Sequence, residues 1–214
     1  MLKRVYVWEF PVRLTHWLNF LGILVLSVSG YYIGTPFIHG TGQEVMVMGI
    51  FRFLHFVAAY VFTVCVFVRI YWWFMGNRYA KWNQFVPTTP ERWTNTMDSA
   101  FFYAFLKRDL PHSPGHTGLA GITYLFMFVL FLLEILTGFA LYSQSHVGAI
   151  WTLMGGWLLG VWTSGTIRLI HHLIMWVIAV FVIFHVYISW HNDRIERNGL
   201  MSSIFSGFKT MDEH

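Results

Sequence analysis

Four stretches of this chain are each long and apolar enough to cross a lipid bilayer. A span requires about 20 predominantly apolar residues, and the sequence meets this requirement at residues 14–33, 51–75, 118–142 and 167–190. Because the bilayer core offers no water to satisfy peptide groups, each such segment must be helical. Only 11% of the residues are charged, against roughly a quarter in a soluble domain. The sequence therefore predicts a single all-α membrane domain over residues 1–214, built as a four-transmembrane-helix bundle.

The positions of lysine and arginine predict how these helices are oriented. Basic residues concentrate in the cytoplasmic loops of membrane proteins. Here they lie before the first span, in the long loop 76–117 and after the last span, whereas loops 34–50 and 143–166 contain none. We therefore expect both termini and loop 76–117 to be cytoplasmic. The basic residues form no cluster for nucleic acid, and no small-residue cleavage site follows the first apolar stretch, so we expect no removable signal peptide.

Two of the loops carry apolar patterns of their own. In loop 76–117, apolar residues recur at helical spacing within residues 95–107, which predicts a helix lying along the membrane surface. Loop 143–166 is rich in glycine and contains Trp151, Trp157 and Trp162. Such apolar surface outside a span indicates either partial insertion into the membrane or a docked partner.

Four histidines lie at matching depths within the apolar stretches, at His16, His55, His171 and His185. Imidazole is costly in a bilayer core, so these residues are candidates for a functional role. Because successive spans alternate in direction, His16 and His185 lie near the cytoplasm, and His55 and His171 lie near the outside. His171 and His185 are 14 residues apart, which places them within roughly 40° on one helix face and about 21 Å apart along its axis. The sequence therefore predicts two layers of paired histidines.

Paired histidines at equal depth suit the two axial positions of a haem iron. We predict two haem b groups as cofactors, with the outer haem iron bound by His55 and His171 and the inner one by His16 and His185. His172 would point roughly 140° away from His185 on the same helix. We therefore favour His171 over His172 as the ligand. A haem-free membrane anchor or transporter that uses its histidines for protons or metals is the alternative.

Arginine stands three residues before three of these histidines, at Arg13, Arg52 and Arg168. Residues i and i+3 share one helix face, and the forked guanidinium group suits the carboxylates of haem propionates. We therefore predict that these arginines hold propionates at the membrane surfaces. Snorkelling of the side chains to the interface is the alternative.

Glu134 is a carboxyl group within the third span, beyond its midpoint toward the outside. An ionised carboxylate is costly there, so we expect Glu134 to be protonated or paired with a polar group. A structural hydrogen bond is one interpretation. A role in proton movement or in tuning the outer haem is the other.

Several motifs in the chain resemble those of one family of membrane cytochromes. The motifs are V-x-E-F-P-V-R-L-T-H-W at residues 7–17, R-F-L-H at 52–55, G-H-T-G at 115–118, G-T-I-R-L-I-H-H-L-x-M-W at 165–176 and H-V-Y at 185–187. Together they resemble the b-type cytochrome subunit of membrane-bound [NiFe] hydrogenases, and more broadly the di-haem cytochrome b subunits of formate dehydrogenases. They cover nearly the full length in the expected order.

The resemblance implies an electron-transfer subunit of a hydrogen:quinone oxidoreductase in the bacterial cytoplasmic (inner) membrane. Loops 34–50 and 143–166 would then be periplasmic, and the partners would be the small and large hydrogenase subunits in an oligomeric complex. Electrons would pass from the small-subunit iron–sulfur cluster through the outer and inner haems to membrane quinone. The chain itself has one cysteine, Cys65, so it can hold no nickel site or iron–sulfur cluster, and we expect no catalytic residue in it.

The same resemblance implies a quinone site on the cytoplasmic side, beside the inner haem. A quinone needs hydrogen-bond donors to its carbonyls and a source of protons, which histidine and tyrosine can supply. The candidates are His116, His191 and Tyr124. A free-standing quinone-linked cytochrome of the b561 type, acting without a hydrogenase, is the alternative function.

Overall fold

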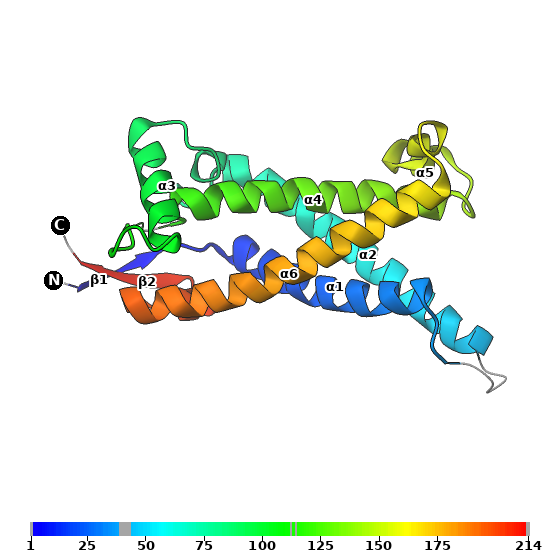
Figure 1. Cartoon of the computed structure of the whole chain (residues 1–214), viewed down its shortest axis with the longest axis horizontal. Helices are drawn as coiled ribbons and strands as arrows, with labels where there is room; N and C mark the ends of the chain where they lie inside the picture. Colours follow the sequence, from blue (N-terminus) through cyan, green and yellow to red (C-terminus); the bar gives the residue numbers. More distant parts are fainter. Residues whose placement is uncertain (1, 39–43, 112, 114, 213–214) are drawn as a thin grey trace. The chain divides into compact units, whose positions relative to one another are not determined.

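The computed structural model describes residues 2–38, 44–111, 113 and 115–212 of the chain (Figure 1). Four long helices dominate it: α1 (Phe10–Gly34), α2 (Glu44–Met75), α4 (Gly118–Ser143) and α6 (Ser164–Glu196). The shorter helices are α3 (Pro90–Tyr103), α5 (Ala149–Met154), α7 (Leu200–Ser206) and the 3₁₀ turns η1 (Trp82–Gln84) and η2 (Gly156–Gly160). Two strands, β1 (Leu2–Tyr6) and β2 (Phe208–Asp212), stand at the ends of the chain.

The four long helices are the four predicted spans. Each is long and apolar enough to cross a membrane, which confirms this part of the prediction. The helices extend beyond the apolar stretches at several ends, and α2 begins at Glu44 rather than at residue 51. Residues 45–50 are mostly apolar as well, so the apolar stretch that includes the second span begins earlier than predicted.

The prediction of an all-α chain is wrong at the two ends. β1 and β2 form an antiparallel two-stranded sheet, in which Val5 pairs with Lys209 (Figure 1). The backbone N–H groups of Val7 and Trp8 continue this pairing by donating to the Gly207 carbonyl, at 2.8 and 3.1 Å. The sequence did not indicate the sheet, because its two five-residue strands are separated by nearly the whole chain and neither one alone satisfies its backbone.

The structure divides into two compact units. The first unit comprises Met1–Thr15, Val68–Val129 and Ile183–His214, and the second comprises His16–Phe67 and Leu130–Val182. Each long helix contributes one stretch to each unit.

A small apolar core holds the first unit together around the N-terminal segment. Val7, Trp8 and Val12 are buried with Tyr79 and Ala80. Two hydrogen bonds to one carboxylate oxygen anchor the same segment: Glu9 Oε2 accepts from Trp72 Nε1 at 2.8 Å and from the Asn77 backbone N–H at 2.7 Å. The N-terminal segment is thereby fixed against the last turn of α2.

In the second unit, side-chain contacts link the helices into a four-helix cluster. The ring contacts are Tyr32–Phe51 at 4.1 Å (α1–α2), Phe62–Phe131 at 5.2 Å (α2–α4) and Tyr31–Trp176 at 6.4 Å (α1–α6). Outside these helices, η2 buries Leu158 against Ala140 and Ile167. Gly155 makes this packing possible, since a Cβ at that position would collide with the Leu136 carbonyl oxygen of α4.

Replacing Glu9 by alanine tests the anchoring of the N-terminal segment. The change leaves two donors without their acceptor, and hydrogen bonds to a charged group contribute about 1.5–3 kcal/mol. We expect a loss of about 2 kcal/mol, which corresponds to a fall of about 4–8 °C in Tm for a chain of this size. Thermal unfolding of the purified protein in detergent measures this fall in Tm. Asp109→Ala, which removes an exposed carboxylate of the same unit, is the control, and equal falls in both variants would contradict the anchoring role.

Candidate functional site

His55 of α2 is held by a serine and a glycine that are adjacent on α1. Ser29 Oγ lies 2.9 Å from His55 Nδ1. A Cβ built on Gly30 would lie only 3.1 Å from His55 Cε1. Ser29 therefore bonds one edge of the imidazole, and Gly30 leaves room for that edge to approach the helix.

His171 of α6 is held in the same way by α4. Thr137 Oγ1 lies 2.9 Å from His171 Nδ1, and a Cβ built on Gly138 would lie 3.3 Å from His171 Cε1. At both histidines, the imidazole therefore packs against a neighbouring helix at a hydroxyl residue that is followed by glycine. The two arrangements lie on different helix pairs, so they are independent examples of one geometry.

The hydrogen bonds of the two hydroxyl groups determine which imidazole nitrogen carries the proton. A hydroxyl has one hydrogen, and each hydroxyl donates it to a helix carbonyl: Ser29 to Val25 at 2.5 Å and Thr137 to Leu133 at 2.7 Å. Each hydroxyl oxygen must therefore accept from Nδ1–H of its histidine. In a neutral imidazole this leaves a lone pair on Nε2, which is the form that binds a metal.

His171 and His172 differ in the helix they contact. His172 is directed toward α1, since a Cβ built on Gly34 would lie 2.8 Å from its Cε1. His171 packs against α4 through Thr137, whereas both histidines lie within electrostatic range of His55. Only His171 of the two therefore has the same local arrangement as His55 among the contacts described here.

Glu134 lies beside His171, one turn before Thr137 on α4. Its Oε2 is 3.4 Å from His171 Nδ1, but it makes no hydrogen bond with any described residue and is buried. Since Thr137 already accepts the Nδ1 proton, the carboxyl group contacts His171 without bonding to it. Glu134 thus has the polar neighbour that the sequence predicted, but the hydrogen bond of one interpretation is not found for Oε2 within the described part of the chain.

In the first unit, His185 of α6 also has a hydroxyl at Nδ1. Tyr124 Oη of α4 lies 3.3 Å from His185 Nδ1. The Tyr124 ring meets the ring of His116 edge-on at 4.8 Å, and the other side of His116 lies 4.8 Å from the ring of Trp8. Two of the three predicted quinone residues, Tyr124 and His116, are thus brought together beside His185.

Three cations surround this group, and they affect its electrostatics. Burial lowers the pKa of His116 well below its ordinary value, and the charges of Arg69, Lys209 and Arg92 lower it further. His116 is therefore neutral at pH 7. Lys209 of β2 is itself only 2% exposed, and its Nζ donates to the Gly115 carbonyl at 3.5 Å. Burial lowers the pKa of Lys209 as well.

The third quinone candidate, His191, makes its ring contact elsewhere. Its ring stacks on Tyr187, one turn earlier on α6, at 6.1 Å. His191 follows His185 by six residues, a rotation of roughly 240° around the helix. The two histidines therefore lie on different faces of α6.

The remaining predicted residues occupy varied surroundings. His16 lies in the second unit with its ring edge-on to Trp17 at 5.3 Å, while His185 belongs to the first unit, so their pairing stays a prediction. Arg13 donates to the Phe205 carbonyl of α7, a partner that the sequence did not indicate. Arg52 and Arg168 are exposed and make no hydrogen bond or ion pair with the residues that the structure describes.

Comparison with known proteins identifies the family. Residues 7–207 match the family described as prokaryotic cytochrome b561. The chain belongs to this family.

Curated relatives of the chain carry more specific names. A protein of Cupriavidus necator is 40% identical over 220 residues, covering 99% of this chain and 89% of the relative. A protein of Rhizobium leguminosarum bv. viciae is 39% identical over 211 residues, covering 96% and 88%. Both are named "Probable Ni/Fe-hydrogenase B-type cytochrome subunit". A "Probable Ni/Fe-hydrogenase 1 B-type cytochrome subunit" of Escherichia coli K12 is 36% identical over 212 residues, covering 96% and 90%. The resemblance indicated by the sequence motifs is confirmed.

The described residues fit the haem b that a b-type cytochrome carries. Such a haem is held by axial side chains, and histidine is a common axial ligand. His55 and His171 each offer an Nε2 lone pair, with Nδ1 fixed by a hydroxyl. This combination of a metal-ready nitrogen and a second bond that orients the ring is typical of metal-binding histidine.

Replacing Thr137 by valine tests whether the hydroxyl prepares His171 for haem. Valine keeps the shape but removes the acceptor of Nδ1–H, and loss of such a partner typically weakens metal binding by about 10–100-fold. We expect less haem per polypeptide after gel filtration, measured by the pyridine haemochrome spectrum, and near-normal haem in Thr137→Ser. The matched control is Thr123→Val on the same helix, whose hydroxyl only donates to the Leu119 carbonyl at 2.9 Å. Equal haem loss in Thr123→Val would contradict the role of Thr137.

Proposed function

We propose that this chain is the di-haem b cytochrome subunit of a [NiFe] hydrogenase, anchoring it at the periplasmic face of the inner membrane. In this function it transfers electrons from the small-subunit iron–sulfur cluster through two haems to membrane quinone. Membership of the cytochrome b561 family and the names of the relatives support the hydrogenase association. The observation that carries the proposal is the repeated hydroxyl–glycine arrangement around His55 and His171.

The outer haem is assigned to His55 and His171. Haem iron, when bound, supplies one-electron transfer by alternating between two oxidation states. The task of the chain is to present two imidazole nitrogens in a fixed orientation and in the correct tautomer. Ser29 and Thr137 do this through Nδ1, and the glycines beside them allow each ring to pack closely on the neighbouring helix.

The inner haem is assigned to His16 and His185, with Tyr124 as the Nδ1 partner of His185. The propionates of the haems are assigned to Arg13, Arg52 and Arg168. Guanidinium groups bind carboxylates through paired N–H donors. Arg52 and Arg168 have their donors unengaged by other described residues, which supports their part of the assignment.

The quinone is assigned to the group formed by His116 and Tyr124. Reduction of a quinone to a quinol consumes two electrons and two protons, so the site needs groups that hydrogen-bond oxygen and pass protons. His116 is a neutral imidazole in contact with Tyr124, which in turn contacts His185. His191 remains the third candidate, although its ring contact is with Tyr187.

The hydrogenase subunits are proposed to dock on the segment around α5 and η2. Its large apolar side chains are strongly exposed, with Val147 at 99% and Leu153 at 80%. Trp157 and Trp162 are also exposed there. Exposed apolar surface rich in tryptophan is typical of protein interfaces.

The haem content of histidine variants tests the proposed ligands. We expect two haems per polypeptide in the wild-type chain and one in His55→Ala and in His16→Ala, since each removes one axial ligand of a different haem. His172→Ala is the matched control, because it removes the neighbouring imidazole of His171 and should retain two haems. The pyridine haemochrome assay against protein concentration gives the ratio.

Three outcomes would contradict this assignment. A wild-type count in His55→Ala or His16→Ala would refute the pairing, and loss of one haem in His172→Ala with none in His171→Ala would show that the wrong neighbour was chosen. Absence of a b-type α-band in the reduced-minus-oxidised spectrum of the wild-type protein would remove the proposal entirely.

Quinone reduction in His116→Gln tests the quinone site separately from haem binding. Glutamine keeps a hydrogen-bonding side chain but cannot pass a proton as imidazole does, so we expect a loss of at least tenfold in the turnover of hydrogen-dependent quinone reduction. The visible haem spectrum should stay unchanged. His191→Gln serves as the comparison, since His191 lies on another face of α6.

The pattern of the two variants decides the assignment. Unchanged turnover in His116→Gln together with a loss in His191→Gln would move the quinone site to the other face of α6. A changed haem spectrum in His116→Gln would mean that His116 supports the haem rather than the quinone.

A further inference from the structure

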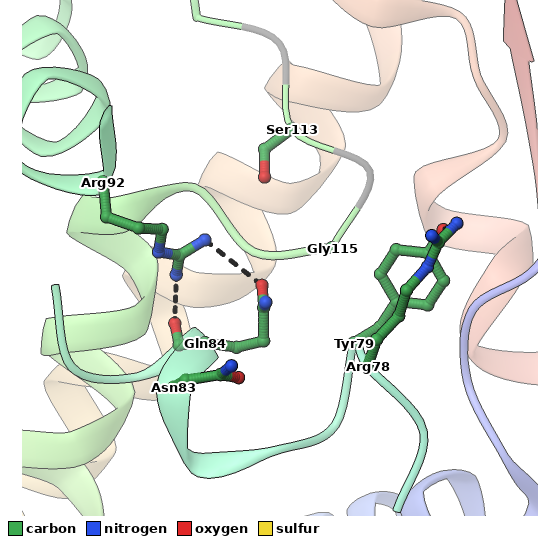
Figure 2. A pocket seen from close by; sticks show the side chains of 7 residues that line it. All are labelled: Arg78, Tyr79, Asn83, Gln84, Arg92, Ser113 and Gly115. Carbon is green, nitrogen blue, oxygen red and sulfur yellow. Dashed lines mark hydrogen bonds between the residues drawn. The ribbon is translucent and has the colours of Figure 1, made fainter. Parts of the chain in front are cut away.

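A polar pocket lies in the first unit, between the end of α2 and the start of α4. It encloses about 380 Å³. The described residues that line it are Arg78, Tyr79, Asn83, Gln84, Arg92, Ser113 and Gly115 (Figure 2). None of the functions assigned above uses this pocket.

The pocket offers positive charge and hydrogen-bond donors but no carboxylate among its described lining residues. Arg92 is fixed in place: it donates to the side-chain and backbone oxygens of Gln84 (Figure 2). It also donates to the His116 carbonyl. Arg78 is exposed, and it donates to the Tyr79 hydroxyl at 2.5 Å. Two guanidinium groups on one polar pocket match the oxygens of a phosphate group.

Helix α3, which carries Arg92, has the reverse of the pattern expected for a helix on a soluble protein. Its buried residues are the polar Thr96 and Ser99. Its exposed side includes Trp93, Met97 and Phe101, which are 53%, 47% and 43% exposed. These three are spaced four residues apart and so form one stripe. A helix that turns an apolar stripe away from its own protein is suited to contact lipid at the membrane surface.

The position of the pocket in the chain supports a location at that surface. Its lining residues fall between Met75, the last residue of α2, and Gly118, the first of α4, and both helices are candidate membrane spans. Trp82 in η1 is adjacent in sequence to the lining residues Asn83 and Gln84, and it is 47% exposed. Tryptophan is enriched where proteins meet the lipid headgroups.

We propose that this pocket binds the phosphate of an anionic phospholipid, with the acyl chains lying along the apolar stripe of α3. A soluble phosphate compound would use the arginines but would leave the stripe uncovered, whereas a phospholipid uses both. Arg78 binds the phosphate, and Arg92 shapes the pocket and adds its charge. The pocket adjoins the proposed quinone site, because its lining residues Arg92 and Ser113 both donate to the His116 carbonyl. The phosphate-binding role of Arg78 does not depend on a haem or a quinone.

The test is lipid binding by the full-length, haem-loaded protein, delipidated in detergent and measured by native mass spectrometry. The probes are dioleoyl phosphatidylglycerol and, as the zwitterionic comparison, dioleoyl phosphatidylcholine. We expect the wild-type protein to bind phosphatidylglycerol preferentially and Arg78→Gln to weaken that binding about tenfold, which is the range for one hydrogen bond between charged groups. Binding of phosphatidylcholine should change little.

Two further variants keep the test specific. Arg108→Gln removes the same charge from the same loop at an exposed position outside the pocket, and we expect it to bind phosphatidylglycerol like the wild-type protein. Asn83→Ala removes an amide donor from the lining and should weaken binding a few-fold. It replaces Arg78→Gln as the deciding variant if that protein shows an altered haem spectrum.

Three results would overturn the proposal. Equal binding of the two lipids by the wild-type protein would remove the preference for an anionic headgroup. Equal weakening in Arg108→Gln would show that only the overall charge of the loop matters. Displacement of phosphatidylglycerol by glycerol phosphate at a matching concentration would identify a soluble phosphate compound, rather than a lipid, as the ligand.

Discussion

The hydrogen bond between a helix hydroxyl and imidazole Nδ1 is the interaction on which the proposed function most depends. In an apolar span, an imidazole has few partners, and an unfixed ring could present either nitrogen. Ser29 and Thr137 resolve this because their own hydrogens are already donated to helix carbonyls. They can only accept from the histidine, so the tautomer and the ring orientation are fixed before any metal binds. Glycine at the next position is what lets the ring come close enough.

In the first unit, the pairing of the two ends of the chain has the corresponding role. The sheet of β1 and β2 places Lys209 in the interior, where its ammonium group donates to Gly115 in the loop before α4. The next residue in that loop is His116, whose other neighbour is Trp8 from the N-terminal segment. Both ends of the chain therefore help to position the residues assigned to the quinone.

Much of the fold and of the candidate site follows from the sequence, and the exceptions have identifiable causes. Length and apolarity were sufficient to predict the four spans. The choice of His171 over His172, made from helical phase, stays a prediction. The surface helix was expected at residues 95–107 but runs from Pro90 to Tyr103, because Thr89 caps it and Pro90 starts it. The roles of Ser29 and Thr137 were missed, although each stands before a glycine in an apolar span. Which histidine a small residue faces depends on how the helices pack, and periodicity within one helix does not contain that information.

The contrast between the hydroxyl partners indicates where protons can enter the proposed reaction. At His55 and His171, the hydrogen bonds lead from the imidazole to a hydroxyl group and from there only to a helix carbonyl, because the hydroxyl hydrogen is donated to the backbone. The hydroxyl partners at these two positions therefore offer no route for a proton. At His185 the partner is the phenol of Tyr124, whose ring lies against the neutral imidazole of His116. Both groups can exchange protons with a bound oxygen. Reduction of a quinone consumes protons, whereas electron transfer between haems does not. This contrast therefore supports the proposal that the quinone binds beside Tyr124 and His116 and that His55 and His171 hold a haem.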